Sequence, residues 1–215
     1  MNIVKEHITE KEESLILTNQ RAIFWEGKNA LILSDLHVGK AAHFRKHGIP
    51  IPDEVFKNDL DRLEGLIRYF KAEQLIVVGD LFHAEANTNM QYFVNWKRQF
   101  QSLEMTLVKG NHDRLSEFWT SKLQLKMVSR LEMKPYLLLH DPDEEHTHSF
   151  TIAGHIHPGV LIKGKGRQKY KMPCYILYNR GLILPAFSNF TGLNSRFKRK
   201  DAVYYAFTES EFFRF

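Results

Sequence analysis

The sequence of 215 residues contains one cysteine, Cys174, and no long hydrophobic run. A single cysteine excludes an internal disulfide framework and suits a reducing compartment. The longest apolar stretches, such as LEMKPYLLLH at 131–140, are far too short to cross a bilayer. The first residues, MNIVKEHITEKEESLIL, carry charges where a signal peptide needs an apolar centre. We therefore expect a cytoplasmic protein that does not associate with membranes.

The chain also lacks internal repeats, low-complexity segments and any linker rich in proline, glycine or serine. Hydrophobic residues make up 43% of the sequence, which is enough for a sizeable core. The length suits one large domain or two small ones. Because no linker divides the chain, we expect a single domain over residues 1–215.

Basic residues outnumber acidic ones by 30 to 25, and the formal net charge is +5. This excess is only a weak indication of an anionic partner, because many basic proteins bind nothing acidic. Histidine is more informative. There are eleven, and they cluster rather than scatter. Since histidine is the commonest metal ligand and a ready acid or base, these clusters indicate a site.

The first half of the chain alternates between strand and helix patterns. Short apolar strands are predicted at 22–25, 29–35 and 74–80, and helical spacing of apolar residues at 53–70 and 89–103. After residue 124 the pattern is mostly that of strands. We expect an α/β fold in which two sheets pack together with helices outside.

Five predicted strands end in side chains that can ligate metals. The five ends are Asp35-Leu36-His37, Gly79-Asp80-Leu81-Phe82-His83, Gly110-Asn111-His112-Asp113, Leu139-His140-Asp141 and Gly154-His155-Ile156-His157. In open α/β sheets, ligands bind outside the carboxyl ends of the strands, so these side chains should converge. The glycines let the backbone approach an ion or phosphate closely. Each motif alone could be a turn or loop, because Asn and Asp also cap turns, but five in this order indicate a shared site.

The order DxH, GDxxH, GNHD, H and GHxH over residues 31–157 resembles the calcineurin-like metallophosphoesterases. A narrower likeness involves SDLHVGKAAHFRKHGIPIP, VVGDLFHAEAN, VKGNHDR, AGHIHPG, MPCY and LPAFSNFTG. These stretches are similar to the DNA-ligase-associated metallophosphoesterases, a family of DNA-damage-response endonucleases, and GDLFH is also similar to the Mre-type nucleases. The resemblance implies a four-layer αββα sandwich of two mixed β-sheets flanked by helices.

The resemblance also implies two divalent metal ions. One would be held by Asp35, His37 and His157, and the other by Asn111, His140 and His155, with Asp80 bridging them. Such mixed nitrogen and oxygen ligands suit Mn²⁺, Fe or Zn rather than Ca²⁺, and we favour Mn²⁺. Two ions can activate a bridging hydroxide that attacks a phosphodiester. His146 and His148 compete with His140, which we prefer because it ends an apolar strand.

Three residues are expected to act in catalysis by the same resemblance. His112 would face the phosphate and protonate the departing alkoxide. Asp113 would either orient His112 or cap the next turn. His83 would touch the scissile phosphate, as the matching histidine does in the similar nucleases.

Further basic residues are candidates for binding the substrate. Lys40, His43, Arg45 and His47 follow the first strand end, and Arg114 follows the third. They would either line the entrance for a phosphate or form an ordinary solvated face.

Two basic segments, 163–171 and 196–200, read as hairpins with one basic face. Such faces are usually only solvated, but near a phosphate-cleaving site they suit nucleic acid. Tyr170 and Phe197 would either pack in the core or stack on bases.

The sequence thus predicts a dinuclear metal-dependent phosphodiesterase, a DNA endonuclease of DNA repair acting on single-stranded or branched DNA. The alternative is a phosphatase or phosphodiesterase for nucleotides or other small phosphoesters, since one metal site serves both. A scaffold that has lost its chemistry is disfavoured because no motif residue is missing. The resemblance also implies a functional association with a DNA ligase and a helicase. Whether the protein is a monomer or a homodimer is left open.

Overall fold

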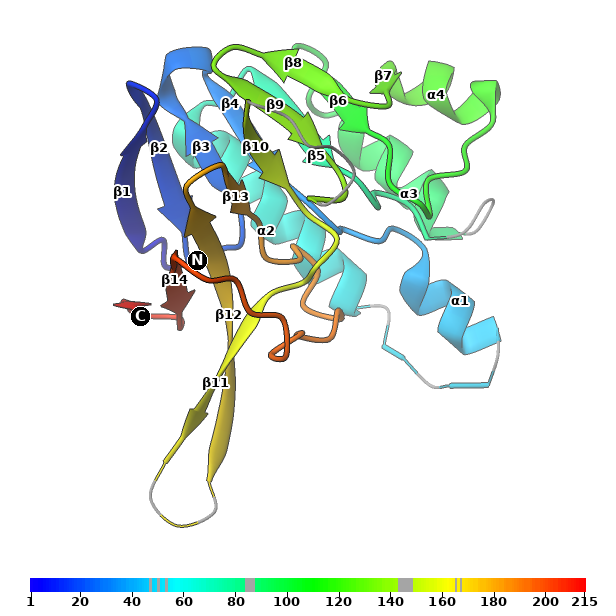
Figure 1. The fold of residues 1–215 in the computed structure, drawn as a ribbon. Helices are drawn as coiled ribbons and strands as arrows, with labels where there is room; N and C mark the ends of the chain where they lie inside the picture. Colours follow the sequence, from blue (N-terminus) through cyan, green and yellow to red (C-terminus); the bar gives the residue numbers. More distant parts are fainter. Residues whose placement is uncertain are drawn as a thin grey trace.

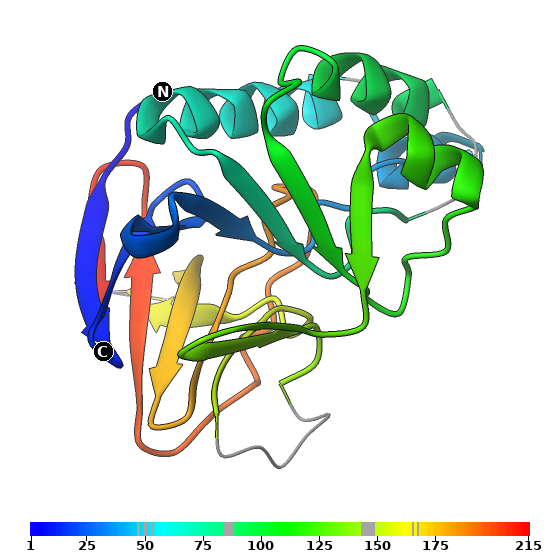
Figure 2. The same cartoon turned by 90° about the horizontal axis from the view of Figure 1, so that it is seen from above.

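In the computed structural model, three layers follow one another: helices, a first sheet and a second sheet (Figures 1 and 2). The structure describes residues 1–215 except 47, 50, 53, 84–87, 143–148, 165 and 167, and it does not describe the side chains of His43 and Lys46. Both chain ends lie at the same end of the molecule (Figure 1). The opposite half carries α1 and α4.

The first sheet has seven strands in sequence order. They are β1 (Lys5–Glu10), β2 (Glu13–Thr18), β3 (Ile23–Trp25), β4 (Ala30–Leu33), β5 (Gln74–Val78), β6 (Glu104–Val108) and β7 (Leu125–Val128). β1 to β4 pair antiparallel, and β4 to β7 pair parallel. Every residue of β4 is buried, which explains its unbroken run of apolar side chains. The parallel strands bring the predicted ends after Leu33, Val78 and Val108 to one edge.

Four α-helices and a short 3-10 helix complete the first half. They are η1 (Glu26–Lys28), α1 (Lys40–Lys46), α2 (Glu54–Phe70), α3 (Thr88–Lys97) and α4 (Glu117–Leu123). α2 follows the predicted periodicity and buries one apolar stripe against the sheet. α3 ends earlier than the pattern at 89–103 predicts. Lys97 donates to the carbonyl oxygen of Phe100 over 2.9 Å, and the chain turns there toward β6, so Phe100 reaches the core from a turn.

The second sheet is built from the remaining strands. They are β8 (Leu131–Met133), β9 (Tyr136–Leu139), β10 (Phe150–Ala153), β11 (Gly159–Lys163), β12 (Lys169–Tyr178), β13 (Gly181–Ile183), β14 (Ala202–Phe207) and β15 (Phe212–Arg214). The order is β15-β14-β12-β13-β10-β9-β8, with β11 paired to β12. β9, β10 and β13 are parallel neighbours, and the other pairs are antiparallel.

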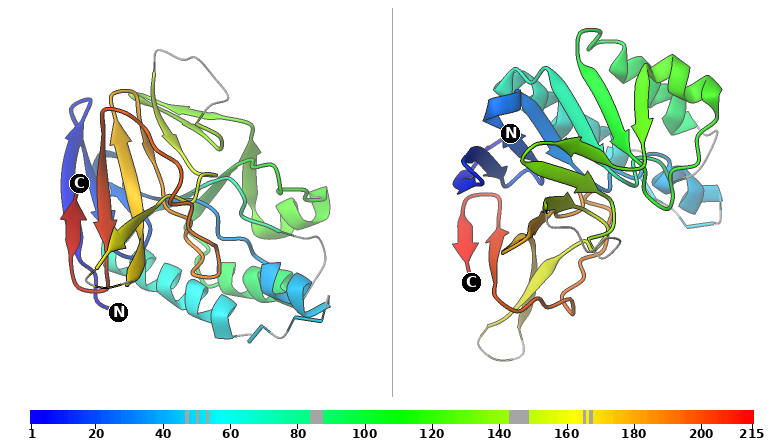
Figure 3. Two further views of the ribbon diagram at one scale, coloured as in Figure 1. Left: turned by 60° about the horizontal axis from the view of Figure 1, so that its bottom comes forward. Right: turned by 45° about the horizontal axis from the view of Figure 1, so that its top comes forward.

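Two apolar cores define the layers. One lies between the helices and the first sheet, and the other lies between the two sheets, where Trp25, Tyr136 and Tyr175 are almost fully buried. The predicted α/β architecture of two mixed sheets with helices is confirmed. All the described helices lie against the first sheet, however (Figure 3). Phe197 packs with Cys174 and Ile176, on the face of the second sheet that is turned away from the core between the sheets. The described parts of the connections in the second sheet contain no helix, so they add no outer helical layer there.

The basic segment 196–200 is not the hairpin that its composition predicts. The side chain of Asn194 accepts the backbone N–H groups of Arg196 and Phe197 over 3.1 and 3.2 Å, which closes a turn. The Arg199 guanidinium lies 3.8 Å from the centre of the Tyr178 ring. The segment is therefore an irregular loop that leads into β14.

The core between the sheets offers a direct stability test. Leu138 is fully buried in it, so Leu138→Ala should lower the free energy of unfolding by about 2–5 kcal/mol. Leu161 is 39% exposed, and Leu161→Ala should change the same quantity by no more than about 0.5 kcal/mol. Urea unfolding followed by circular dichroism measures both variants. Equal losses in the two variants would contradict the assigned layer order.

Candidate metal centre

The ends of β4 and β5 stay paired after the strands themselves finish. The backbone N–H of Asp35 donates to the backbone carbonyl of Gly79 over 3.0 Å. The backbone N–H of His37 donates to the backbone carbonyl of Asp80 over 2.9 Å. These bonds hold the first two predicted motifs side by side. The GNHD motif follows β6, the next strand of the sheet, so three of the five motifs share one edge.

The second sheet brings the other two motifs to the same place. β9 and β10 are parallel neighbours, and their ends supply His140, His155 and His157. The sheets are joined at the site itself. The backbone N–H of His155 donates to Asp35 Oδ2 over 3.2 Å, and that of Ser188 donates to the Asp35 carbonyl over 3.2 Å. The predicted convergence of the five strand ends is therefore seen in the structure.

Six of the predicted ligand residues form two clusters. Asp35, His37 and His157 make the first, and Asp80, His140 and His155 make the second. Within each cluster the ligand atoms lie within 4.8 Å of one another. In the first cluster, His157 Nε2 lies 3.0 Å from Asp35 Oδ1.

In the second cluster, contacts converge on His140 Nε2. It lies 3.0 Å from Asn111 Oδ1, 3.2 Å from His155 Nδ1 and 3.5 Å from Asp80 Oδ2. Asn111 therefore contacts the second cluster through His140. The negative charge of Asp80 also acts to raise the pKa of His37, so this carboxylate lies within electrostatic reach of both clusters.

The donor atoms fit a metal ion. Both ring nitrogens of His37 are buried without a hydrogen-bond partner among the described residues, and Asp35 Oδ1 and His157 Nε2 are buried 3.0 Å apart without hydrogen-bond geometry between them. Burying polar atoms without partners costs free energy, which a bound cation would recover. A set of imidazole and carboxylate ligands suits divalent transition metals. The residues present therefore fit the metal ions that the resemblance implies.

The backbone at the clusters is strained. Positive φ angles occur at Asp35 (56°), His37 (52°), Asp80 (50°), His155 (65°) and His157 (51°). A non-glycine residue rarely adopts this left-handed conformation, and each instance costs about 1–3 kcal/mol. Such strain concentrates at functional sites. The backbone conformation therefore indicates a site at five residues of the two clusters, as their ligand side chains do.

The glycines of three motifs are required by close packing. A Cβ on Gly79 would lie 1.8 Å from His140 Nδ1, and one on Gly110 would lie 2.2 Å from Asp80 Oδ1. A Cβ on Gly154 would lie 2.9 Å from Asp35 Oδ2. These glycines therefore let the backbone pack directly against candidate ligand side chains.

Gly79→Ala is a test of this packing. The added methyl would overlap His140, and the φ of +80° at this position strains any L side chain. We expect a loss of about 1–3 kcal/mol from the backbone alone, and weaker binding of metal because His140 must move. Thermal unfolding and calorimetric titration with Mn²⁺ measure the two effects. Gly48→Ala is the matched control, since it has a φ of +81° with nothing within 4 Å; equal metal affinity in both variants would contradict the prediction.

The pKa values of His37 in the first cluster and His140 in the second are shifted in opposite directions. Burial, reinforced by the charge of Lys40, lowers the pKa of His37 to about 3. Burial also opposes the charge of His140, but the hydrogen bond to Asp80 and the charges of Asp35 and Asp80 raise its pKa to about 9. Metal ligation needs the neutral imidazole. His37 is therefore ready to bind a cation at neutral pH, whereas His140 must first release a proton.

His83 and His112 lie together beside the first cluster. Their ring centres are 5.3 Å apart, and they are 5.9 and 6.2 Å from the His37 ring. The backbone N–H of His112 donates to Asp80 Oδ1 over 3.0 Å, which fixes this residue beside the clusters. His112 is exposed, so its ring is accessible to a substrate.

Asp113 follows the capping alternative rather than the orienting one. Its Oδ1 accepts the backbone N–H of Phe82 over 2.9 Å, and its Oδ2 accepts that of Gly110 over 2.8 Å. Burial raises the pKa of Asp113 to about 6. The carboxylate thus ties the GNHD loop to the loop that carries His83.

The predicted substrate-binding residues differ in where they lie relative to the two clusters. Lys40 lies near the clusters, since the charges of Asp35 and Asp80 both act on it. Arg45 donates to the Ile51 carbonyl over 3.0 Å, and Arg114 is exposed just after the GNHD loop. Outside the described residues lie the side chain of His43 and three whole residues, His47, His146 and His148.

Sequence reasoning missed a buried ionic network that supports the centre. Arg62 pairs with Asp59 over 2.9 Å and donates to the Phe187 carbonyl, while Arg21 donates to the Ala186 carbonyl over 3.1 Å. This loop, at 186–188, in turn holds the backbone of Asp35. The sequence did contain a sign of this network, because Asp59 is a charged residue within the apolar stripe of α2, and the structure buries it.

Comparison with known proteins matches this fold and site to one family. Residues 29–180 match the family model described as calcineurin-like phosphoesterase. The chain therefore belongs to the calcineurin-like phosphoesterase family and is a metal-dependent phosphoesterase.

Among solved structures, a Pseudomonas putida nuclease, MPE, is similar with a TM-score of 0.82 and 28% sequence identity. The match covers 99% of this chain and 100% of that one. The E. coli phosphoesterase Yfce matches with a TM-score of 0.44 and 16% identity, over 82% of this chain and 86% of its own. No curated protein matches the sequence. Within the part of the chain that is described, no helix has the length and apolarity to span a membrane.

Proposed function

We propose that this protein is a phosphodiesterase that cleaves DNA, an endonuclease of DNA repair that uses Mn²⁺. The observation that carries the proposal is the pair of candidate ligand clusters with His83 and His112 beside them. The likeness to a nuclease over 99% of this chain and 100% of that one supports a nucleic acid as the substrate. The motifs shared with DNA-ligase-associated enzymes support a place beside a ligase and a helicase in the cytoplasm.

Each cluster would hold one ion. Asp35, His37 and His157 form the first ligand set, and Asn111, His140 and His155 form the second, with Asp80 within electrostatic reach of both. When bound, two divalent ions supply Lewis-acid charge to a phosphate and activate a water for attack on phosphorus. The protein keeps the ligands in place through the hydrogen bonds between motif backbones and through the tight glycine contacts.

His112 and His83 would act on the phosphodiester itself. His112 is exposed beside the clusters, and its position is fixed by the bond of its backbone N–H to Asp80. It would donate a proton to the leaving alkoxide oxygen as the P–O bond breaks. His83 would hold a non-bridging phosphate oxygen, because its ring lies next to that of His112. Lys40 would add positive charge near the phosphate.

The test is cleavage of DNA by metal-loaded protein. Mn²⁺-loaded protein should cut single-stranded and branched DNA, and a circular single strand should be opened if the action is endonucleolytic. Failure to cut any form of DNA would rule the proposal out. Comparing bis-p-nitrophenyl phosphate with p-nitrophenyl phosphate then separates a diesterase from a phosphatase for small monoesters, which prefers the second compound.

A further inference from the structure

The β11–β12 hairpin extends away from the body of the molecule (Figure 1). Gly159 pairs with Pro173 at its base, and Lys163 pairs with Lys169 near its tip. The base lies next to the metal centre in sequence, because Gly159 comes two residues after His157. At about 3.3 Å per residue, the tip of β11 reaches roughly 20 Å beyond His157.

The register of the hairpin separates two different faces. Directly paired residues share a face, and so do alternate residues along each strand. Val160, Ile162 and Met172 therefore share one face, and they pack against the cluster around Cys174. Tyr170, on the same face, is 55% exposed and lies outside the core.

The charged residues of the other face are all basic, and Leu161 also lies on it, paired with Lys171. Lys163, Lys169 and Lys171 lie on it, and all three are exposed. Within the described part of the chain, none of them has an ion-pair partner. Like charges placed directly opposite each other, as Lys163 and Lys169 are, destabilise a hairpin. A polyanion bound along this face, which we name the lysine face, would remove that repulsion.

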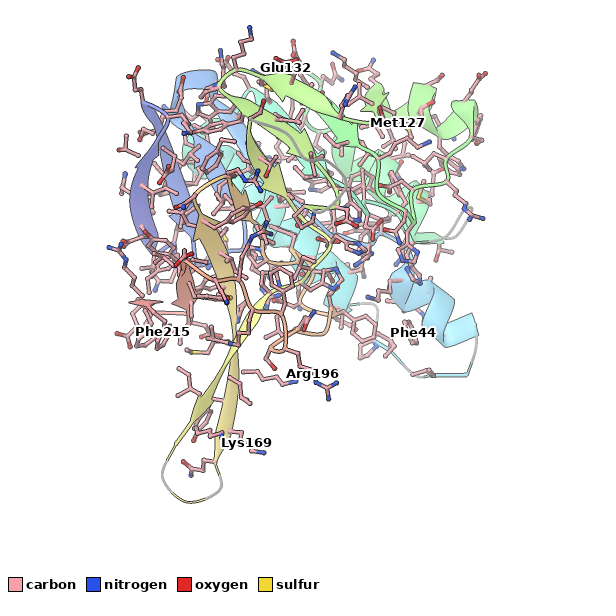
Figure 4. The ribbon with its side chains drawn as sticks, in the orientation of Figure 1. Phe44, Met127, Glu132, Lys169, Arg196 and Phe215 are labelled. Atoms are coloured by element: carbon pink, nitrogen blue, oxygen red, sulfur yellow. The ribbon has the colours of Figure 1, made fainter. Side chains whose placement is uncertain are left out.

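A second basic segment starts from the same point. Asn194 donates its backbone N–H to the His157 carbonyl over 2.8 Å and accepts that of Gly159 over 3.2 Å. The loop that follows carries exposed Arg196, Lys198 and Lys200, and Phe197 anchors it on the apolar face of the hairpin. In Figure 4, Arg196 lies between the hairpin and α1, and Lys169 lies farther out along the hairpin. Both basic segments therefore begin close to His157.

We propose that the lysine face binds the sugar-phosphate backbone of DNA on one side of the cleavage site. This inference rests on the proposed function and adds the surface that holds the substrate. Lysine binds phosphate as a point charge, so the contact would be independent of base sequence. Neutralised phosphates release counterions, and such contacts give affinity that falls with salt.

The test compares two variants that each remove three positive charges. The first is Lys163→Gln/Lys169→Gln/Lys171→Gln. The control is Lys28→Gln/Lys71→Gln/Lys126→Gln, whose exposed lysines lie near the amino ends of the parallel strands, at the opposite edge from the metal centre. Fluorescence anisotropy with a long single strand and metal-free protein gives the affinity at several salt concentrations. Hydrolysis of bis-p-nitrophenyl phosphate with Mn²⁺ reports the state of the metal centre.

The lysine-face variant should bind the long strand about 10- to 100-fold more weakly, and its slope of log K against log salt should fall by about 2. Its hydrolysis of bis-p-nitrophenyl phosphate should equal that of the unmodified protein, because the small diester cannot reach the hairpin. The control variant should keep nearly the full slope. Equal slopes in the two variants would overturn the proposal.

The outcomes also separate this inference from the proposed function. If the unmodified protein cuts DNA and the lysine-face variant binds and cuts it equally well, the nuclease assignment stands and the DNA-binding face is wrong. If the unmodified protein cuts no DNA but binds it with a slope that falls by about 2 in the lysine-face variant, the face stands and the nuclease assignment fails. Unmodified protein that neither binds nor cuts DNA overturns both.

Discussion

Asp80→Asn is expected to abolish hydrolysis of both DNA and bis-p-nitrophenyl phosphate. Asp80 contacts His140 in the second cluster, and its charge also acts on His37 in the first. Asparagine keeps the volume and an oxygen that can accept the His112 backbone N–H, but it removes the negative charge. Metal ions contribute several kcal/mol of transition-state stabilisation, so activity should fall by about 10³-fold or more.

Calorimetric titration with Mn²⁺ should show fewer or weaker sites in the Asp80→Asn variant, and steady-state rates should fall for both substrates. Asp61→Asn is the matched control, because Asp61 is an exposed carboxylate on α2 away from the strand ends. It should leave both measurements unchanged. Full activity and unchanged Mn²⁺ binding in Asp80→Asn would remove the basis for the metal centre.

His112→Ala is expected to lower the cleavage of DNA much more than the hydrolysis of bis-p-nitrophenyl phosphate. A DNA strand leaves as an alkoxide, which needs a proton, whereas nitrophenolate leaves as a stable anion without one. General acid catalysis contributes about 10²–10⁴-fold, so DNA cleavage should fall by that factor. Hydrolysis of bis-p-nitrophenyl phosphate should change little, because the His112 backbone bond to Asp80 is retained by alanine.

Single-turnover rates with saturating Mn²⁺ measure this division. His7→Ala serves as the control, since His7 is an exposed histidine on β1, far along the chain from every motif. It should leave both rates unchanged. Equal losses on DNA and on the small diester in His112→Ala would show that His112 supports the metal centre and does not act as the acid.

The strands that carry the motifs were predictable from sequence. β4 is uniformly apolar, β5 and β6 are apolar apart from Gln74, Glu104 and Thr106, and polar residues follow all three, which is the pattern of buried parallel strands. Helix α2 was predictable from its apolar stripe. The N-terminal hairpin of β1 and β2 was not predicted, because its exposed strand mixes charged and apolar residues without a clear period.

Other errors have a tertiary origin. The composition of 196–200 resembles that of 163–171, but the Asn194 side chain closes a turn that prevents strand pairing. Asp113 could orient His112 or cap a turn by its sequence context alone. Only the placement of Phe82 beside Gly110 shows that the carboxylate joins two loops.

Local sequence determined which residues can ligate a metal and which strand each of them follows, since residue type and apolar pattern are properties of short segments. The pairing of His157 with Asp35, and of His140 with Asn111 and Asp80, was decided by the tertiary structure. Those partners lie on different sheets, and the packing of the core between the sheets brings them together. Strained φ angles at five candidate ligand residues persist because that packing over-determines them.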